Sequence, residues 1–414
     1  MASDHPPASA PWRALVVLAA AAALIAKVAL SARSRGTVDV AYWERFLVDI
    51  TASGGDVYVR NELFNHPPFM IHFLRAVGAL AAWTGAPFAF CLRLPGILAD
   101  VGTVAVIWRL RDSLAPARVH PVVIVLLALA PAALMISGHH GNTDSLMIFF
   151  VVLAVLLAER HAAGWPAGIA LGMAMCVKMP AAIFLPTFVL SRRPWPRRVA
   201  LLGAVATTVG VASMPYLRGH VALIAQHVLA YRGGATPWGW PLLAELARTQ
   251  AQELLLTGPS PVAPALLIGL YRAAVHTHAI YAAWSRPALL AALCLAAWAM
   301  NHFARHLPLF TQCAITAALF LFLAPGFGVQ YLAWIVPWVA AAGALPAAFF
   351  HLTSGALSTR STAPTTSAGR PPGAAACSAG SPSASSSPPA CGTPYAGAAL
   401  AGLRSPSPSA WRPC

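Results

Sequence analysis

The sequence contains few charged residues. Asp, Glu, Lys and Arg make up 9% of its 414 residues, whereas 58% are hydrophobic and the mean hydropathy is +0.67. A soluble globular domain carries about 25% charged residues. Apolar runs of the ~17–25 residues that a helix needs to cross a bilayer recur along the chain. These features exclude an ordinary soluble protein and predict an integral, multi-pass membrane protein.

Other signatures are also missing. The seven cysteines show neither C-x-x-C nor metal-ligand spacing, which argues against a disulfide framework and a zinc site. The sequence shows no nucleotide-binding globular domain and no internal repeat. The net charge of +15 arises from short basic clusters between apolar runs, which is the positive-inside pattern of membrane proteins. We therefore expect no nucleic-acid partner.

The hydrophobic pattern predicts an all-α polytopic protein with about ten membrane-spanning helices, within a range of eight to twelve. The first run is interpreted as a retained helix and not as a signal peptide, because no small-residue cleavage site follows it. The expected spans are 12–31, 91–109, 121–138, 144–159, 164–178, 180–192, 199–215, 287–303, 308–323 and 329–350.

Flanking segments complete the predicted organisation. Residues 1–11 form a cytoplasmic N-terminus and 12–350 the transmembrane module. Residues 351–414 form a tail rich in Ser, Pro, Ala and Gly, which we expect to be disordered because it has little apolar surface to bury. Segments 68–84 and 262–284 are expected to be helices lying along the outer membrane interface.

The basic connectors at 109–118 and 192–198 are predicted to be cytoplasmic. This orientation places the loops 32–90 and 216–286 outside a membrane that we expect to be a bacterial cell membrane. Eight of the twelve acidic residues then lie at the outer face. They are Asp39, Glu44, Asp49, Asp56, Glu62, Asp144, Glu245 and Glu253.

One lysine stands out. Lys178 is one of two lysines in the chain and lies between apolar segments in Met175-Cys-Val-Lys178-Met-Pro180. A lysine at the bilayer centre costs ~2.5–3.5 kcal/mol on insertion scales, so an intramembrane charge indicates function by default. Pro180 is expected to break the helix near the outer surface, where the ammonium can bind a phosphate. Snorkelling of the side chain to the interface is the alternative.

Polar and aromatic residues of three other segments are candidates for the same outer site. In the first outer loop an acid and two aromatics follow the first helix, and a His-Pro-Pro step comes later. Interface anchoring, a simple turn and helix capping are the alternative roles for these segments. The candidates are Asp39, Tyr42, Trp43, His66, His140, Asn142, Asp144, Gln330 and Tyr331.

Arg93 and Asp100 share one face of the second span, because seven residues separate them. An internal ion pair between the two is one interpretation. Arg93 should lie near the surface, so binding of a lipid phosphate is the other.

With these motifs in order, the sequence resembles the GT-C superfamily of membrane-embedded glycosyltransferases over about residues 12–350. It looks most like bacterial and archaeal relatives of two groups: the mannosyltransferases that use polyprenyl-phosphate mannose, and the eukaryotic glucosyltransferases of lipid-linked oligosaccharides. The landmarks are Asp39 with Tyr42-Trp43, Asn65-His66-Pro67-Pro68, Arg93-Leu94-Pro95, Gly141-Asn142-Thr143-Asp144-Ser145, Lys178 with Pro186, Tyr231 with Trp238-Gly239, and Gln330-Tyr331-Leu332-Ala333-Trp334.

The resemblance implies inverting transfer of a hexose from a polyprenyl-phosphate donor to a lipid or glycan acceptor at the outer face. Asp39 would be the general base, and Lys178, or failing that Arg93, would bind the donor phosphate. Asn142 and Asp144 would bind sugar hydroxyls or the acceptor. No cofactor is implied, and a divalent metal lacks support because no D-x-D pair surrounds Asp39.

Two other bases and two other functions stay open. Asp49 and Asp56 are rival bases. A transporter or flippase for a lipid-linked or small polar solute would also use intramembrane charge and broken helices. A non-catalytic scaffold is the third reading. Under the transferase hypothesis, Asp39, Asp144 and Lys178 should converge on one outer cavity.

Overall fold

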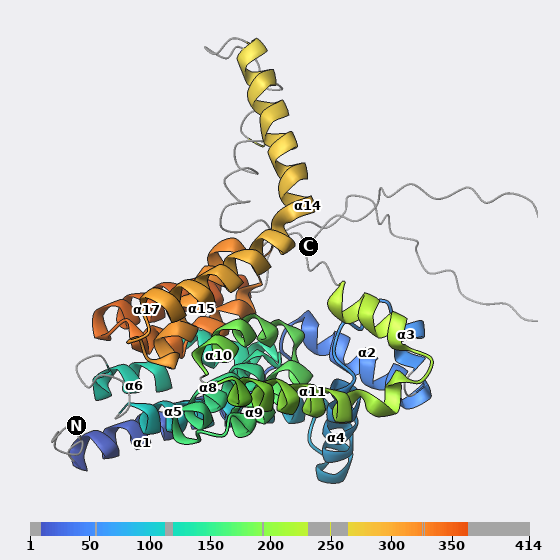
Figure 1. Cartoon of the computed structure of the whole chain (residues 1–414). Helices are drawn as coiled ribbons and strands as arrows, with labels where there is room; N and C mark the ends of the chain where they lie inside the picture. The colour runs from blue at the N-terminus through green and yellow to red at the C-terminus, as the bar shows by residue number, and fades with distance from the viewer. Residues whose placement is uncertain are drawn as a thin grey trace, which may run out of the picture. The chain divides into compact units, whose positions relative to one another are not determined.

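The computed structural model describes residues 10–53, 56–111, 119–192, 194–230, 249, 264–324, 326 and 328–362. Among these residues every regular element is a helix, and no strand is present (Figure 1). Four helical segments are long and apolar enough to cross a membrane, and several shorter apolar helices accompany them. The predicted all-α, polytopic membrane architecture is confirmed.

Most of the predicted spans correspond to helices with similar bounds. The long segments are α1, α5, the run 121–140 and α11. The helices that match single predicted spans are α1 (Ala10–Arg33), α5 (Phe88–Leu110), α8 (Asp144–Arg160), α9 (Trp165–Val177), α11 (Trp195–Leu217) and α15 (Leu309–Leu323).

Helices α8, α9 and α11 pack side by side, and α1 packs along α5 (Figure 1). Two glycines explain the close approach of α9 to α11. A Cβ atom on Gly168 would lie 2.5 Å from the backbone oxygen of Leu201, and one on Gly172 would lie 2.8 Å from Thr208 Cβ. Small residues allow such backbone contact, which drives helix association where lipid removes the hydrophobic force between helices.

The segment 32–90, which was predicted to be an outer loop, is itself helical. It contains α2 (Val38–Ser53), α3 (Val57–Arg60) and α4 (Phe69–Thr84). Helix α4 coincides with the predicted interfacial segment 68–84 and packs against α2 and α5. The loop is thus folded onto the helical bundle.

The predicted span 180–192 is divided into the 3₁₀-helix η3 (Met179–Phe184) and α10 (Leu185–Ser191), and three other predicted helices also differ from the structure. The run 121–138 is divided into α6 (Pro121–Ala128), α7 (Pro131–Met135) and the π-helix η2 (Ile136–His140), because Pro131 cannot continue α6. The run 329–350 is divided into η5 (Val329–Tyr331), α16 (Leu332–Ile335), η6 (Trp338–Ala341) and α17 (Ala344–Thr362).

The third difference concerns residues 262–284 and 287–303, which were predicted to be separate. They form one helix, α14 (Pro264–Phe303), with Pro287 inside it. At the other end of the chain, α17 continues beyond the predicted start of the tail at residue 351. Residues 363–414 lie outside the described residues, so their predicted disorder stays a prediction.

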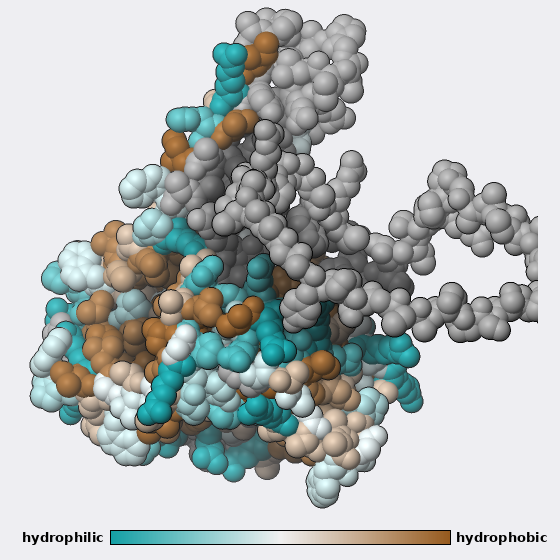
Figure 2. Space-filling model, turned by 90° about the vertical axis from the view of Figure 1, so that its right-hand side faces the viewer, coloured by the Kyte–Doolittle hydropathy of each residue, from teal (hydrophilic) through white to brown (hydrophobic). Residues whose placement is uncertain are grey.

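Large apolar side chains are exposed over much of the surface, as the brown areas of one face show (Figure 2). Examples are Leu290 at 60% and Phe322 at 62% exposure. Exposed apolar area of this extent is unusual for a soluble monomer. It is the surface expected where helices contact lipid.

Candidate functional site

The candidate site begins at a helix break. Helix α9 ends at Val177, and Lys178 is extended, with φ −156° and ψ 120°. Pro180 stands in the first turn of the 3₁₀-helix η3 (Met179–Phe184), where its missing N–H is tolerated although it could not continue α9. The predicted helix break near Pro180 is therefore present, and Lys178 lies between the two helices with an extended backbone.

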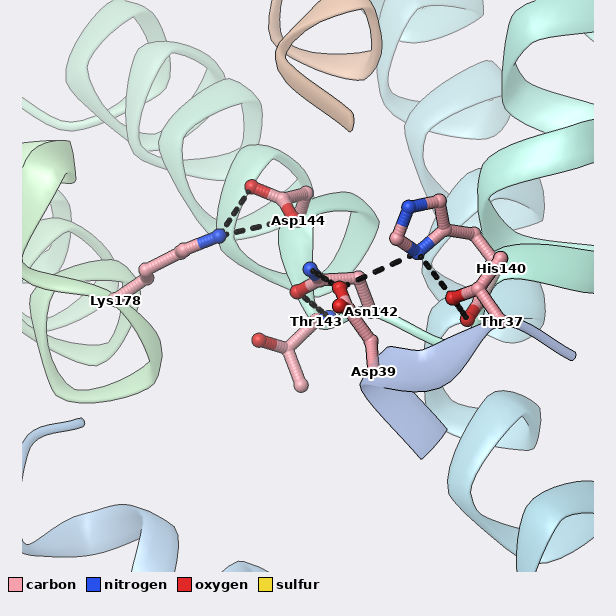
Figure 3. A network of polar contacts seen from close by, with 7 residues as sticks. All are labelled: Thr37, Asp39, His140, Asn142, Thr143, Asp144 and Lys178. Carbon is pink, nitrogen blue, oxygen red and sulfur yellow. Dashed lines mark hydrogen bonds and ion pairs between the residues drawn. The ribbon is translucent and has the colours of Figure 1, made fainter. Parts of the chain in front are cut away.

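The ammonium of Lys178 binds a buried carboxylate. Its Nζ lies 2.8 Å from Asp144 Oδ1 and 3.0 Å from Oδ2 (Figure 3). The indole N–H of Trp334 donates to the same Oδ1. The side chain of Asp144 is 0% exposed and that of Lys178 is 16% exposed. Since both carboxylate oxygens are occupied and inaccessible, the geometry argues against the predicted contact of Asp144 with sugar hydroxyls.

Asp39 lies in the first turn of α2, and its carboxylate is 30% exposed. The Asn142 amide donates to its Oδ2 at 3.0 Å, and His140 Nδ1 lies 3.4 Å from the same oxygen (Figure 3). The hydroxyl of Thr37 lies 3.3 Å from His140 Nδ1 and donates to the backbone oxygen of His140. His140 thus contacts the same carboxylate oxygen of the candidate base as Asn142 does.

The turn between η2 and α8 brings the two groups together. Gly141 has φ 79°, a left-handed conformation that glycine adopts readily, and it ends η2. Asn142 follows and turns its amide to Asp39, while Asp144 opens α8 and faces Lys178. Thr143 occupies the N-cap position without a side-chain capping bond, so helix capping does not account for this motif.

Asp39 and Lys178 line one cavity of about 650 Å³. It is formed by residues of α2, the 61–68 loop, the break at Lys178, η4 (Ala225–Leu229), α14 and the 328–334 segment. Eight of the eleven predicted site residues line it: Asp39, Tyr42, Trp43, His66, Asn142, Lys178, Gln330 and Tyr331.

Two pairs of aromatic rings line this cavity. The rings of Trp43 and His66 stack with centroids 4.4 Å apart, and Tyr331 lies beside Trp334 at 4.5 Å. Burial, together with the nearby charge of Lys178, lowers the pKa of His66 to about 3. The imidazole is therefore neutral at physiological pH, and it offers a hydrogen-bonding group without adding a charge beside Lys178.

Arg93 does not line the cavity. Its side chain is buried, and Nη1 donates to the backbone oxygens of Ser31 at 3.1 Å and Ser34 at 2.9 Å. The considered ion pair with Asp100 is wrong, because Asp100 binds Lys27 of α1. The structure thus leaves Lys178 as the predicted donor-phosphate ligand that reaches the cavity.

Some lining residues were missed by the sequence analysis. Trp334 was noted within the Gln330 motif, but its role as the partner of Asp144 was not predicted. Asn65 belongs to the predicted His66 landmark. Glu62 was named only among the acidic residues of the first loop, and Arg286 belongs to no motif of the sequence. The landmark around Tyr231 and Trp238 lies outside the described residues.

Residues 65–229 match the model of a protein family described as dolichyl-phosphate-mannose-protein mannosyltransferase. The match includes His66, Asn142 and Lys178 but begins after Asp39. A search of the curated proteins and of the solved structures gave no significant match. The predicted resemblance is confirmed: over residues 65–229 this membrane protein carries the sequence pattern of glycosyltransferases of the GT-C type.

Proposed function

We propose that the protein transfers a hexose, with inversion, from a polyprenyl-phosphate donor to a lipid or glycan acceptor at the outer membrane face. The observation that carries this proposal is the shared cavity, where a carboxylate and an ammonium from distant segments both reach the same space. A carboxylate suits proton removal from an acceptor, and an ammonium suits a departing phosphate.

Asp39 acts as the general base. Its carboxylate accepts the proton of the acceptor hydroxyl as the oxygen forms a bond with the anomeric carbon. The bond from that carbon to the donor phosphate oxygen breaks, and the phosphate leaves with the electron pair. The amide of Asn142 fixes one carboxylate oxygen, which leaves the other to face the acceptor.

Lys178 stabilises the charge that develops on the leaving phosphate. Asp144 holds the ammonium in place and favours its charged form, because a buried amine is otherwise disfavoured as a cation. An ammonium has three donors, and both Asp144 oxygens lie near it. The phosphate would approach from the cavity side, where the side chain of Lys178 remains accessible.

The sugar would lie against aromatic rings of the cavity. Tyr42, which is exposed, and Tyr331 offer rings, while Asn142, Gln330 and His66 offer hydrogen-bonding groups. The proposal includes no divalent metal and no nucleotide. It favours a polyprenyl-phosphate donor because residues 65–229 match a family whose name specifies dolichyl-phosphate mannose.

The test replaces Asp39 by Asn and measures hexose transfer from a polyprenyl-phosphate donor in proteoliposomes. Loss of the base should lower kcat at least about 100-fold, within the range that general-base catalysis contributes. Asp49→Asn is the matched control. Asp49 lies on the same helix but accepts from Asn61 and does not line the cavity, so its variant should retain activity.

Three results would contradict the proposal. Full activity of Asp39→Asn, or loss of activity in Asp49→Asn alone, would assign the base elsewhere. Movement of the donor across the bilayer without any sugar transfer by the wild-type protein would favour a transporter or flippase instead.

A further inference from the structure

We propose that Arg93 is a positioning residue, which holds the start of helix α2 and the Gly141 turn together so that Asn142 meets Asp39. The inference rests on the proposed function for its catalytic consequence. It replaces the predicted role of Arg93 as a ligand of the donor phosphate.

The first argument is the hydrogen bonding of the guanidinium. Nη1 donates to the backbone oxygens of Ser31 and Ser34, which stand at the end of α1 and in the linker to α2. The last carbonyl groups of a helix have no partner within the helix and carry partial negative charge. Arg93 therefore caps α1 and fixes the path of the linker that leads into α2, whose first turn contains Asp39.

The second argument is that both segments of the site pack directly on this side chain. A Cβ atom on Gly36 would meet Arg93 Nη2 at 2.0 Å, and one on Gly141 would meet Nε at 3.3 Å. Both glycines have positive φ, 86° and 79°. Arg93 is thus the shared neighbour of the linker before Asp39 and of the residue before Asn142.

The third argument is that an apolar side chain would suit a purely structural role better. Arg93 is 2% exposed, and its Nε and Nη2 have no hydrogen-bond partner among the described residues. Burying a charge with unmatched donors costs free energy, and apolar replacement of such groups is often neutral or stabilising. Both backbone contacts come from Nη1, which stands at the end of a rigid planar group, whereas the ammonium of lysine is a compact point charge on a flexible stem.

The experiment compares Arg93→Met and Arg93→Lys with wild type in the full-length, detergent-purified protein. In Arg93→Met, kcat should fall about 100-fold, the size expected for a displacement of about 1 Å at the reacting group. The KM for the donor should change less than about twofold, because the lining residue Lys178 is untouched. Arg93→Lys should recover only part of the rate.

A cycle with Asp39→Asn separates positioning from direct binding. If Arg93 acts through Asp39, adding Arg93→Met to Asp39→Asn should reduce kcat little further. Additive losses, or a raised KM for the donor, would overturn the inference and restore the phosphate-binding role.

Hydrogen exchange tests the same inference without any activity. Amides of residues 35–40 and 140–143 should exchange faster in Arg93→Met, whereas those of α9 should not change. Unchanged exchange would overturn the inference even if the protein transfers no sugar. Full activity of Asp39→Asn would contradict the proposed function alone.

Arg75→Met is the matched control. Like Arg93, Arg75 donates to a backbone oxygen, that of Ile50 in α2, but it neither donates to the linker nor lines the cavity. Its variant should retain wild-type kcat and wild-type exchange at residues 35–40. A loss equal to that of Arg93→Met would show that any arginine bound to backbone near the site has this effect, which would overturn the specific role of Arg93.

Discussion

Removal of the ammonium of Lys178 should destabilise the fold as well as stop transfer. In Lys178→Met the carboxylate of Asp144 stays in a site with 0% exposure, with the indole of Trp334 as its remaining side-chain donor among the described residues. Breaking a buried ion pair on one side costs about 3–5 kcal/mol. Since the side chain of Lys178 is 16% exposed, we expect a loss near the lower limit, about 3 kcal/mol.

Adding Asp144→Asn to this variant should restore stability. The amide oxygen still accepts from Trp334, and the uncompensated charge is gone. The double variant should therefore be more stable than either single variant, with a coupling free energy of about 2 kcal/mol. It should remain inactive, because no cation faces the donor phosphate.

The measurement is equilibrium unfolding in detergent–lipid micelles, with transfer assayed on the same preparations. A double variant as unstable as Lys178→Met, with coupling below about 0.5 kcal/mol, would refute the reasoning. In that case the two side chains would not depend on each other in the folded protein. Transfer at the wild-type rate by the stable double variant would refute the catalytic role of Lys178.

Three further predictions concern neighbouring groups. Asn142→Ala removes a donor to the Asp39 carboxylate and should lower kcat about tenfold, because such a hydrogen bond contributes about 1.5 kcal/mol. An unchanged kcat would show that catalysis does not need this bond. The pKa of His66 is about 3 in the folded protein and 6.5 in the unfolded chain. Below pH 6.5 the unfolded chain therefore binds a proton that the folded protein does not, and the unfolding free energy falls as the pH falls. At pH 5 the wild-type protein should have lost about 1–2 kcal/mol of unfolding free energy, measured by thermal unfolding, and His66→Asn should show no such loss. The same pH dependence in both proteins would argue against a lowered pKa of His66. Lys27→Met leaves Asp100 without its cation and should lower the unfolding free energy by about 2–3 kcal/mol. The kcat per folded molecule should not change. A changed kcat would show that this ion pair affects the site.

The sequence predicted those features of the site that depend on local pattern. Lys178 is a lone cation beside a proline in an apolar run, and the break at Pro180 follows from the missing N–H of proline. Asp39 with its aromatic neighbours follows the first helix directly. These signals require only the neighbouring residues, and the structure places both groups at one cavity.

Long-range partners could not be predicted in this way. The pairing of Asp100 with Lys27 spans 73 positions, and that of Trp334 with Asp144 spans 190. The seven-residue spacing of Arg93 and Asp100 indicates a shared helix face but not what packs on it. Which helix faces which is decided by side-chain packing between distant segments.

By itself, the sequence determined that the chain is a helical membrane protein with scarce charges, because the cost of placing charge in lipid restricts where they occur. Only the tertiary structure decided which of these charges contact each other. The close approach of segments at Gly36 and Gly141 buries Arg93 behind the site, and the packing of α8 beside the helix break directs Asp144 to Lys178. Burial and contact distance, which fix the role of an ionisable group, arise only when separate helices come together.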